Sequence, residues 1–350
     1  MSELLAIKNV TKRFRGGTVA LDNVSFSIDD EVPSIIAVAG ESGSGKSTLG
    51  LMTLGFLTPS EGEVLYRGKD LSKMSRTELF NFRKEAQAVF QDPFAAYNPF
   101  YNVDHIMNVP IRNFRLAKSN AEAKRMIDDA LTAVGLRPEE TLGRFPHQLS
   151  GGQRQRMVVA RALLLKPKLL IADEPVSMVD ASLRATILGS LHTLNRDFDI
   201  TILYITHDLT TAYHVSDYIL ILYRGAVMEA GFVETVISEP KHPYTQLLID
   251  SIPWPDLEQQ WGQQEIIDME EDTSEASMIG CKFAGRCPHV MEKCKVSPPP
   301  LYQVNDDRVA SCYLYDENTV LPGEDLGKIF KSRKIRTPTN GAAPEIVVSR

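Results

Sequence analysis

The sequence predicts an α/β fold in which helices cover a mostly parallel sheet. Two observations support this prediction. Between residues 168 and 208, apolar strand-like runs enclose a helix-like run, and such alternation is typical of parallel sheets covered by helices. In addition, a glycine-rich loop at 40–47 follows a buried-looking strand and precedes a helix, which is the order found in doubly wound folds.

The expected elements begin with short strands, because apolar residues recur with the short period of strands in the first 91 residues. The strands predicted there are 4–10, 23–28, 34–40, 63–68 and 85–91, with a helix from Lys46. The pattern then becomes helical at 102–165. The helix predicted at 121–136 should stop near Gly135, because Pro138 follows.

The later elements return to the α/β alternation. Strands are expected at 168–174 and 200–208, with a helix at 182–198 between them. Residues 217–231 are expected to form a β-hairpin, because two apolar runs flank an Arg-Gly turn.

A chain of 350 residues is long enough for one large domain and an appendage. We expect the large domain at 1–252, with a helical subdomain at about 92–165. Residues 253–278 are acidic and lack Lys and Arg, which is typical of a solvated linker. All four cysteines lie in a module at 279–320, and the basic segment 321–350 is expected to be a flexible tail rather than a binding segment.

The net charge of −7 argues against a nucleic-acid partner, because the chain would repel the phosphate backbone. No run reaches the roughly 20 apolar residues that cross a bilayer, and the N-terminus lacks the features of a signal peptide. We therefore expect a cytoplasmic protein that contacts membranes only through partners.

The segment Gly40–Ser47, GESGSGKS, fits the phosphate-binding pattern G-x-x-x-x-G-K-[ST]. Its glycines let backbone N–H groups surround the phosphates, Lys46 reaches the β- and γ-oxygens, and the Ser47 hydroxyl holds Mg²⁺. The alternative is a chance glycine-rich turn, which the flanking strand and helix argue against.

Asp173 and Glu174 end the predicted strand at 168–174, so their carboxylates should leave the sheet at the edge where the phosphate loop lies. Asp173 suits the ordering of Mg²⁺, and Glu174 suits the polarisation of an attacking water. Alone, an Asp-Glu pair after a strand could simply cap a helix; beside a phosphate loop, it favours catalysis.

The segment Leu149–Arg156, LSGGQRQR, resembles the signature motif of ATP-binding-cassette (ABC) ATPases, and the resemblance extends over about residues 4–252. It implies a P-loop NTPase core with an antiparallel β subdomain and a helical subdomain, and the use of ATP and Mg²⁺. The catalytic residues it implies are Glu174, His207 and Lys46. The implied nucleotide-binding residues are Phe14, Gly40, Ser42, Gly43, Ser44, Gly45, Lys46, Ser47, Thr48, Gln91, Ser150, Gly151, Gly152, Gln153, Asp173 and Asp180.

Several of these roles come only from the resemblance. Gln91 matches the residue that touches both Mg²⁺ and the membrane partner, His207 matches the switch histidine at the γ-phosphate, and Asp180 matches the loop at the dimer interface. Phe14 would stack on adenine, although a lone Phe near a strand end is about as often a core residue. Mg²⁺ would be held by Ser47, Gln91 and Asp173.

The resemblance also implies a head-to-tail dimer of cassettes, with each ATP between one chain's phosphate loop and the other chain's signature. Ser150 and the N–H groups of Gly151 and Gly152 would then complete the phosphate cage. The family commonly has Ser-Ala-Leu-Asp where this chain has residues 177–180, Ser-Met-Val-Asp, which affects only the apolar packing of that interface. The second cassette could be the same chain or a paralogue.

Two stretches look like those of ATPase subunits of the oligopeptide/dipeptide importer family, which also includes nickel and oligosaccharide importers. They are FPHQLSGGQRQRM and the segment around His242-Pro243-Tyr244-Thr245, which on spacing alone could be an ordinary helix start. The resemblance implies integral-membrane permease subunits and, indirectly, an extracytoplasmic solute-binding protein as partners. It places the chain at the cytoplasmic face of the cell membrane. The alternative is a soluble regulatory ABC ATPase with an iron- or redox-sensing cysteine module.

The four cysteines are Cys281, Cys287, Cys294 and Cys312. Cytosolic thiols rarely form disulfides, so their clustering favours a metal or a cluster. Zinc sites prefer closer pairs, whereas four thiolates also suit a 4Fe-4S cluster, and the spacing alone leaves both open. The importer family often ends in such a module with an iron–sulfur site, so the resemblance implies a cluster over zinc or unmetallated thiols. It does not favour His289 as a substitute ligand.

Overall fold

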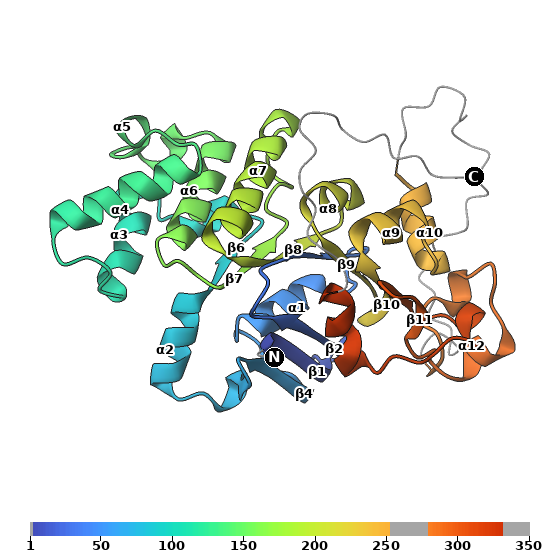
Figure 1. The fold of residues 1–350 in the computed structure, drawn as a ribbon. Helices are drawn as coiled ribbons and strands as arrows, with labels where there is room; N and C mark the ends of the chain where they lie inside the picture. Colours follow the sequence, from blue (N-terminus) through green and yellow to red (C-terminus); the bar gives the residue numbers. More distant parts are fainter. Residues whose placement is uncertain (1–2, 253–278, 332–350) are drawn as a thin grey trace, which may run out of the picture.

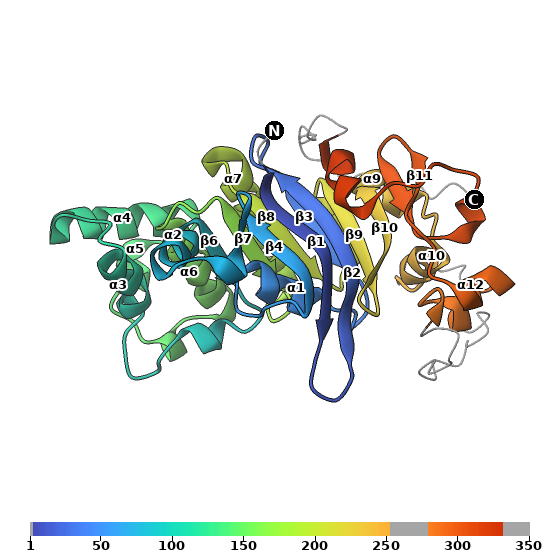
Figure 2. The same ribbon diagram turned by 90° about the horizontal axis from the view of Figure 1, so that it is seen from below.

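The computed structural model describes residues 3–252 and 279–331, and two sheets form their centre (Figure 2). The smaller sheet is antiparallel, with the order β2-β1-β4-β5. Its strands are β1 (Glu3–Arg13), β2 (Val19–Asp29), β4 (Glu61–Tyr66) and β5 (Lys69–Asp70). This is the antiparallel β subdomain that the sequence resemblance implies.

The larger sheet has eight strands in the order β11-β12-β10-β9-β3-β8-β7-β6. The run from β9 to β6 is parallel throughout, which confirms the predicted parallel core. Its strands are β3 (Ile35–Ala39), β6 (Ala86–Val89), β7 (Leu169–Asp173), β8 (Thr201–Thr206) and β9 (Tyr218–Tyr223). The antiparallel extension consists of β10 (Ala226–Phe232), β11 (Tyr302–Asn305) and β12 (Arg308–Ala310). The predicted hairpin at 217–231 is the β9–β10 pair.

Strand β3 shows how the larger sheet is buried on both faces. Ile35, Ala37 and Ala39 point into a core shared with the outer helices, whereas Ile36 and Val38 point into a core shared with the smaller sheet. The helices of the first core include α6 (Gly151–Leu163), α7 (Ala181–Phe198), α8 (Leu209–Val215) and α9 (Val233–Ser238), and α1 (Lys46–Thr53) belongs to the second. Burial on both faces explains why the strand sequences are almost wholly apolar.

The predicted helical subdomain lies at one end of the molecule (Figure 1). It contains α3 (Asp104–Asn113), α4 (Asn120–Ala133), α5 (Pro138–Thr141) and α6, with short 3-10 turns at Pro93–Ala96 and Pro146–Gln148. Ser119 caps α4 by accepting the N–H of Glu122, and Gly135 follows its end at a φ of +69°. The helix therefore stops where the glycine and proline signals predict.

The other helices of the described residues lie outside this subdomain. Helix α2 (Arg76–Glu85) precedes β6, while α10 (Pro243–Asp250) and α12 (Glu292–Val296) lie towards the end of the chain. Further 3-10 turns are at Leu71–Lys73, Ala284–Arg286, Tyr313–Tyr315 and Gly323–Lys331. None of the helices within residues 3–252 and 279–331 is long and apolar enough to span a bilayer.

The C-terminal segment is built into the cassette rather than attached beside it. Strand β12 pairs with β10, and the 3-10 helix Gly323–Lys331 packs on β2 with Leu326, Ile329 and Phe330 buried. The expectation of a flexible tail from residue 321 is therefore wrong as far as Lys331, because these apolar side chains add to the second core. The predicted linker at 253–278 and the rest of the tail lie outside the described residues.

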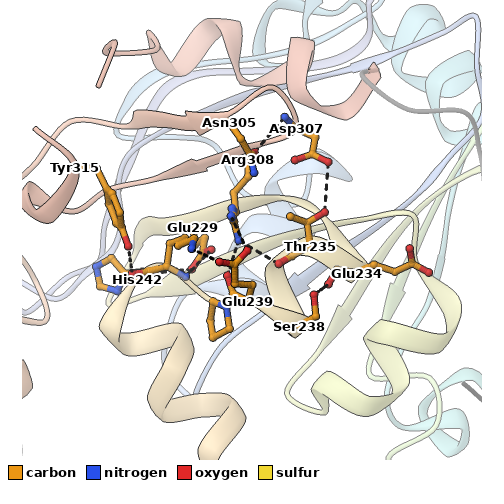
Figure 3. Close-up of polar contacts among 12 residues, drawn as sticks. Glu229, Glu234, Thr235, Ser238, Glu239, His242, Asn305, Asp307, Arg308 and Tyr315 are labelled. Carbon is orange, nitrogen blue, oxygen red and sulfur yellow. Dashed lines mark hydrogen bonds and ion pairs between the residues drawn. The ribbon is translucent and has the colours of Figure 1, made fainter. Parts of the chain in front are cut away.

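A buried polar network fastens β12 to β10 and to the segment between α9 and α10 (Figure 3). Arg308 of β12 is 1% exposed and donates to the carbonyl oxygens of Thr235 and Glu239. Glu229 of β10 is fully buried, and its carboxylate accepts the backbone N–H groups of Lys241, at 3.1 Å, and His242, at 2.9 Å. A buried arginine and a buried glutamate on neighbouring strands thus connect the C-terminal segment and β10 to the same stretch of chain between α9 and α10.

The network predicts a pH-dependent stability. Burial raises the pKa of Glu229 to about 7 from its ordinary 4.5, against the opposing effects of its N–H donors and Arg308. The folded chain therefore keeps a proton that the unfolded chain releases, and stability should fall as pH rises towards and through 7. We expect Glu229→Gln to lack this component, so that wild type loses about 2 kcal/mol relative to the variant between pH 5 and pH 8.

Urea unfolding at both pH values measures this difference. The exposed Glu317 of the same segment, changed to Gln, is the control and should follow wild type. Equal pH dependence of wild type and Glu229→Gln would contradict the assignment.

Candidate functional site

The phosphate loop, residues 40–47, connects β3 to α1 and is closely confined by neighbouring backbone. Gly40 has a φ of +148° and Gly45 a φ of +102°, in the region that glycine adopts readily. A Cβ added to Gly40 would lie 2.1 Å from the carbonyl oxygen of Leu222, and one added to Gly45 would lie 2.3 Å from that of Ala20. Both glycines are therefore required by conformation and by space.

Lys46 is buried inside this loop, with 6% of its surface exposed. Its Nζ donates to the carbonyl oxygens of Gly40, at 2.7 Å, and Glu41, at 2.8 Å. Burial lowers the pKa of Lys46, while the carboxylates of Glu174, Asp173 and Glu41 raise it. The ammonium group is thus held at the loop before any phosphate binds.

Two predicted Mg²⁺ ligands lie beside Lys46. The Ser47 hydroxyl is 3.4 Å from Asp173 Oδ1, which links the first turn of α1 to the end of β7. Burial raises the pKa of Asp173, the Ser47 hydrogen bond lowers it, and nearby Glu174 raises it further. An ion with two positive charges at this position would offset both raising effects.

The Glu174 carboxylate contacts two other predicted residues, His207 and Gln91. Its Oε1 lies 2.9 Å from His207 Nδ1, and its Oε2 accepts from Gln91 Nε2 at 3.1 Å. Gln91 follows β6, Glu174 follows β7 and His207 follows β8, so the carboxyl ends of three adjacent parallel strands meet here. Glu174 has a φ of +45°, an uncommon conformation for a glutamate that marks the end of β7.

The signature motif forms the start of α6. The Ser150 side chain accepts the N–H of Gln153 at 3.2 Å, and Gln153 Oε1 accepts the N–H of Ser150 at 2.9 Å. A Cβ added to Gly152 would lie 2.6 Å from the Leu183 side chain, so close packing against α7 accounts for this glycine. Within the described part of the chain, no hydrogen bond or ion pair joins the signature to the phosphate loop. Within the described residues, the signature and the phosphate loop are therefore separate polar sites of the same chain.

The remaining predicted residues differ in how far they are exposed. Phe14, at the β1–β2 turn, is 41% exposed with the Lys12 ammonium 5.5 Å from its ring centre, so it is not a core residue. Asp180 is exposed before α7, and its side chain caps no backbone N–H of that helix. In the phosphate loop, Ser42 and Gly43 are exposed and Ser44 is buried. Thr48 in α1 and Gly151 in α6 are half-buried.

The four cysteines line a single cavity with apolar and aromatic walls, together with His242 and His289. None of the four is in a disulfide. Burial raises the pKa of Cys281 to about 11 and that of Cys312 to about 12. Within residues 3–252 and 279–331, no three His, Cys, Asp or Glu side chains are arranged to hold a single metal ion.

Residues outside the predicted set also contact the phosphate loop. Arg286 pairs with Glu41, and the Tyr244 hydroxyl accepts the Glu41 N–H at 2.9 Å. Tyr244 belongs to the motif 242–245, which the sequence analysis used only for classification. No pattern in the sequence pointed to Glu41 or Arg286.

Comparisons with known proteins agree with this geometry. A family model described as ABC transporter matches residues 21–177, and one described as oligopeptide/dipeptide transporter, C-terminal region, matches 228–294. The putative oligopeptide transport ATP-binding protein YkfD of Bacillus subtilis is 39% identical over 317 residues, which are 89% of this chain and 95% of that protein. The chain belongs to the ABC transporter family. The oligopeptide transport ATP-binding protein OppF of Haemophilus influenzae is 36% identical over 294 residues, covering 84% and 88% of the two chains.

The ABC assignment extends to the fold. A solved ATP-binding cassette, described as dimeric, in a post-hydrolysis state and bound to ADP and Pi, has a TM-score of 0.59 and 30% identity to this chain. The match covers 65% of this chain and 98% of the solved one. This ABC chain is therefore an ATPase with the cassette fold, followed by the C-terminal region of the oligopeptide/dipeptide class.

Proposed function

We propose that this ABC chain is the ATP-hydrolysing motor subunit of a membrane importer for oligopeptides or dipeptides. The observation that carries the catalytic part is the convergence of Gln91, Glu174 and His207 beside the phosphate loop. The solute class rests on the matched C-terminal region and on relatives named as oligopeptide transport ATP-binding proteins. Those names favour a transport subunit over a soluble regulatory ATPase.

In the proposed reaction, Lys46 binds the β- and γ-phosphates. Ser47, Gln91 and Asp173 would hold or order Mg²⁺, which would neutralise phosphate charge when bound. Glu174 accepts a hydrogen bond from the attacking water and aligns it with the γ-phosphorus. His207 contacts the γ-phosphate and, through its 2.9 Å contact, fixes the orientation of the Glu174 carboxylate. The backbone N–H groups of the loop and of the α1 N-terminus stabilise the phosphate charge.

The site is completed by a second cassette, either the same chain or a paralogue, in a head-to-tail dimer. Ser150 and the N–H groups of Gly151 and Gly152 then act on the nucleotide of the other subunit, Gln153 supports them as part of the cap, and Asp180 lies at the seam. Two observations support this arrangement. Among the described residues, no hydrogen bond or ion pair joins the signature to the phosphate loop of the same chain, and the similar solved cassette is described as dimeric. Loss of the γ-phosphate would release the contacts that hold the halves together.

Coupling to the membrane passes through the helical subdomain. Three aromatic side chains follow Gln91 and are strongly exposed, namely Phe94 at 53%, Phe100 at 88% and Tyr101 at 51%. Exposed aromatic side chains of this kind suit docking of a permease subunit's cytoplasmic helix. Because Gln91 contacts Glu174, movement of that helix would reach the catalytic carboxylate. The chain would then lie at the cytoplasmic face of the membrane, with a solute-binding protein on the other side.

The role of Glu174 is tested by Glu174→Gln in the assembled transporter. We expect ATP hydrolysis to fall by about 10²–10⁴-fold, because the amide cannot accept a proton from water, while ATP binding is retained. The variant should accumulate as an ATP-bound cassette dimer, detectable by cross-linking across the seam. The exposed Glu139, changed to Gln, should leave turnover unchanged. Hydrolysis near the wild-type rate in Glu174→Gln would contradict the assigned role.

The solute class is tested by uptake. A strain lacking the gene should lose import of labelled di- and oligopeptides, and wild type should restore it while Glu174→Gln should not. Unchanged peptide uptake together with lost uptake of a labelled oligosaccharide would replace the proposed solute. Loss of neither, with the protein found only in soluble fractions, would favour the regulatory ATPase.

We further propose that Cys281, Cys287, Cys294 and Cys312 together hold a 4Fe-4S cluster. The supporting observation is that all four thiols line one cavity. Within residues 3–252 and 279–331 the side chains are not arranged around a single ion, so the proposal rests on the shared cavity and on the sequence resemblance. A cluster needs ligands farther apart than zinc does, because its own irons and sulfides lie between them. When bound, it would act as a cross-link in a segment with little core of its own.

Metal analysis of anaerobically purified full-length protein tests this. Iron and acid-labile sulfide near four per chain are expected for a 4Fe-4S cluster, with loss of both in Cys287→Ser. Zinc at one per chain without iron would contradict the cluster.

A further inference from the structure

The cysteine-containing segment contacts the phosphate-binding loop directly. Arg286 lies in the turn Ala284–Arg286, one residue before Cys287. Its Nη1 donates to Glu41 Oε2 at 3.0 Å, and its Nη2 donates to Glu41 Oε1 at 3.2 Å. The ion pair is bidentate and largely buried: the Arg286 side chain is 13% exposed and the Glu41 side chain 32%. A bidentate pair fixes the orientation of the carboxylate as well as its distance from the guanidinium.

A second contact holds the backbone of the same residue. The hydroxyl of Tyr244, a fully buried side chain, accepts the Glu41 N–H. The Tyr244 ring packs against Tyr223 and Phe283, with ring centres 4.5 and 5.5 Å away, and Arg286 also donates to the Tyr223 hydroxyl. Both the side chain and the N–H of Glu41 are therefore fixed by residues outside the loop.

Glu41 in turn holds the loop's functional lysine. Its carbonyl oxygen accepts from Lys46 Nζ at 2.8 Å and from the Ser44 N–H at 3.2 Å. One residue thus connects the C-terminal segment on one side with the phosphate-binding ammonium on the other. Displacing Glu41 would move the acceptor that keeps Lys46 in place.

The Arg286–Glu41 pair also affects the charge of the phosphate loop. Glu41 puts a carboxylate into a loop whose ligand is a triphosphate, and Arg286 neutralises it. Without Arg286, a half-buried negative charge would remain unpaired in the loop that binds an anionic ligand.

We propose that Arg286 and Tyr244 are positioning residues of the ATPase site, through which the cysteine-containing segment sets the affinity of the cassette for ATP. Arg286 cancels the Glu41 charge and fixes its side chain, and Tyr244 fixes its N–H. This proposal rests on the ATPase assignment but on neither the solute nor the metal state of the thiols.

The test uses full-length chain assembled with its membrane subunits, and measures Kd for MgATP together with KM and kcat. Arg286→Ala should raise Kd and KM by about tenfold, the scale of a lost charged hydrogen bond, with kcat changed far less. Arg286→Lys keeps the positive charge but cannot form the bidentate pair, so its Kd and KM should lie between those of wild type and Arg286→Ala. Tyr244→Phe keeps the ring and should raise KM by about threefold.

A double variant separates positioning from mere damage to the fold. Glu41→Gln removes the charge that Arg286 neutralises, so Arg286→Ala/Glu41→Gln should bind ATP more tightly than Arg286→Ala alone. Damage to the segment would instead leave the double variant as weak as the single one. Lys293→Ala, which removes the ion pair with Asp316 inside the same segment, is the matched control and should behave as wild type.

The outcomes are distinct. Wild-type affinity in Arg286→Ala, or no recovery in the double variant, would overturn the proposal and leave the ATPase function intact. A wild-type chain that binds no MgATP would overturn both.

Discussion

The cassette depends on a phosphate loop whose backbone is confined between the two sheets. On one side, Gly40 approaches the carbonyl oxygen of Leu222 in β9; on the other, Gly45 approaches that of Ala20 in β2. The N–H of Gly225, in the β9–β10 turn, donates to the Ser44 carbonyl at 3.0 Å. Neither sheet can shift without moving these contacts. They therefore restrict the loop backbone and favour an orientation of its N–H groups that is set before a phosphate arrives.

This confinement explains which parts of the molecule could be predicted. β3, β7 and β8 are buried on both faces, so they read as continuous apolar runs, and residues following parallel strands must gather at one edge. The position of Glu174 beside the phosphate loop was therefore predictable from the strand pattern, whereas Gln91 and His207 were placed at the site only by the family resemblance. The hydrogen bonds among these three residues were not predictable, because side-chain orientation at a residue such as Glu174 depends on a left-handed backbone that the pattern does not encode.

The C-terminal segment was the part least accessible from the sequence. β12 has only three residues, Arg308–Ala310, and begins with an arginine, which normally indicates exposure rather than a buried strand. Its partner β10 is separated from it by a long acidic stretch, so no local signal joins them. The same holds for Arg286 and Glu41, which lie 245 positions apart. Such contacts arise from long-range docking, and a propensity argument has no access to them.

The motif at 242–245 shows what that docking achieves. Its backbone is tied to Glu229 through the His242 N–H, and His242 Nδ1 accepts the Tyr244 N–H at 3.0 Å, which directs the two rings to different sites. The imidazole forms part of the wall of the thiol cavity, whereas the Tyr244 hydroxyl reaches the phosphate loop. Residues 242–245, which spacing alone describes as a helix start, thus contact the sheet, the cysteine cavity and the phosphate loop. If Tyr244 and Arg286 position Glu41 as proposed, loss of the C-terminal segment would disturb the loop that binds ATP.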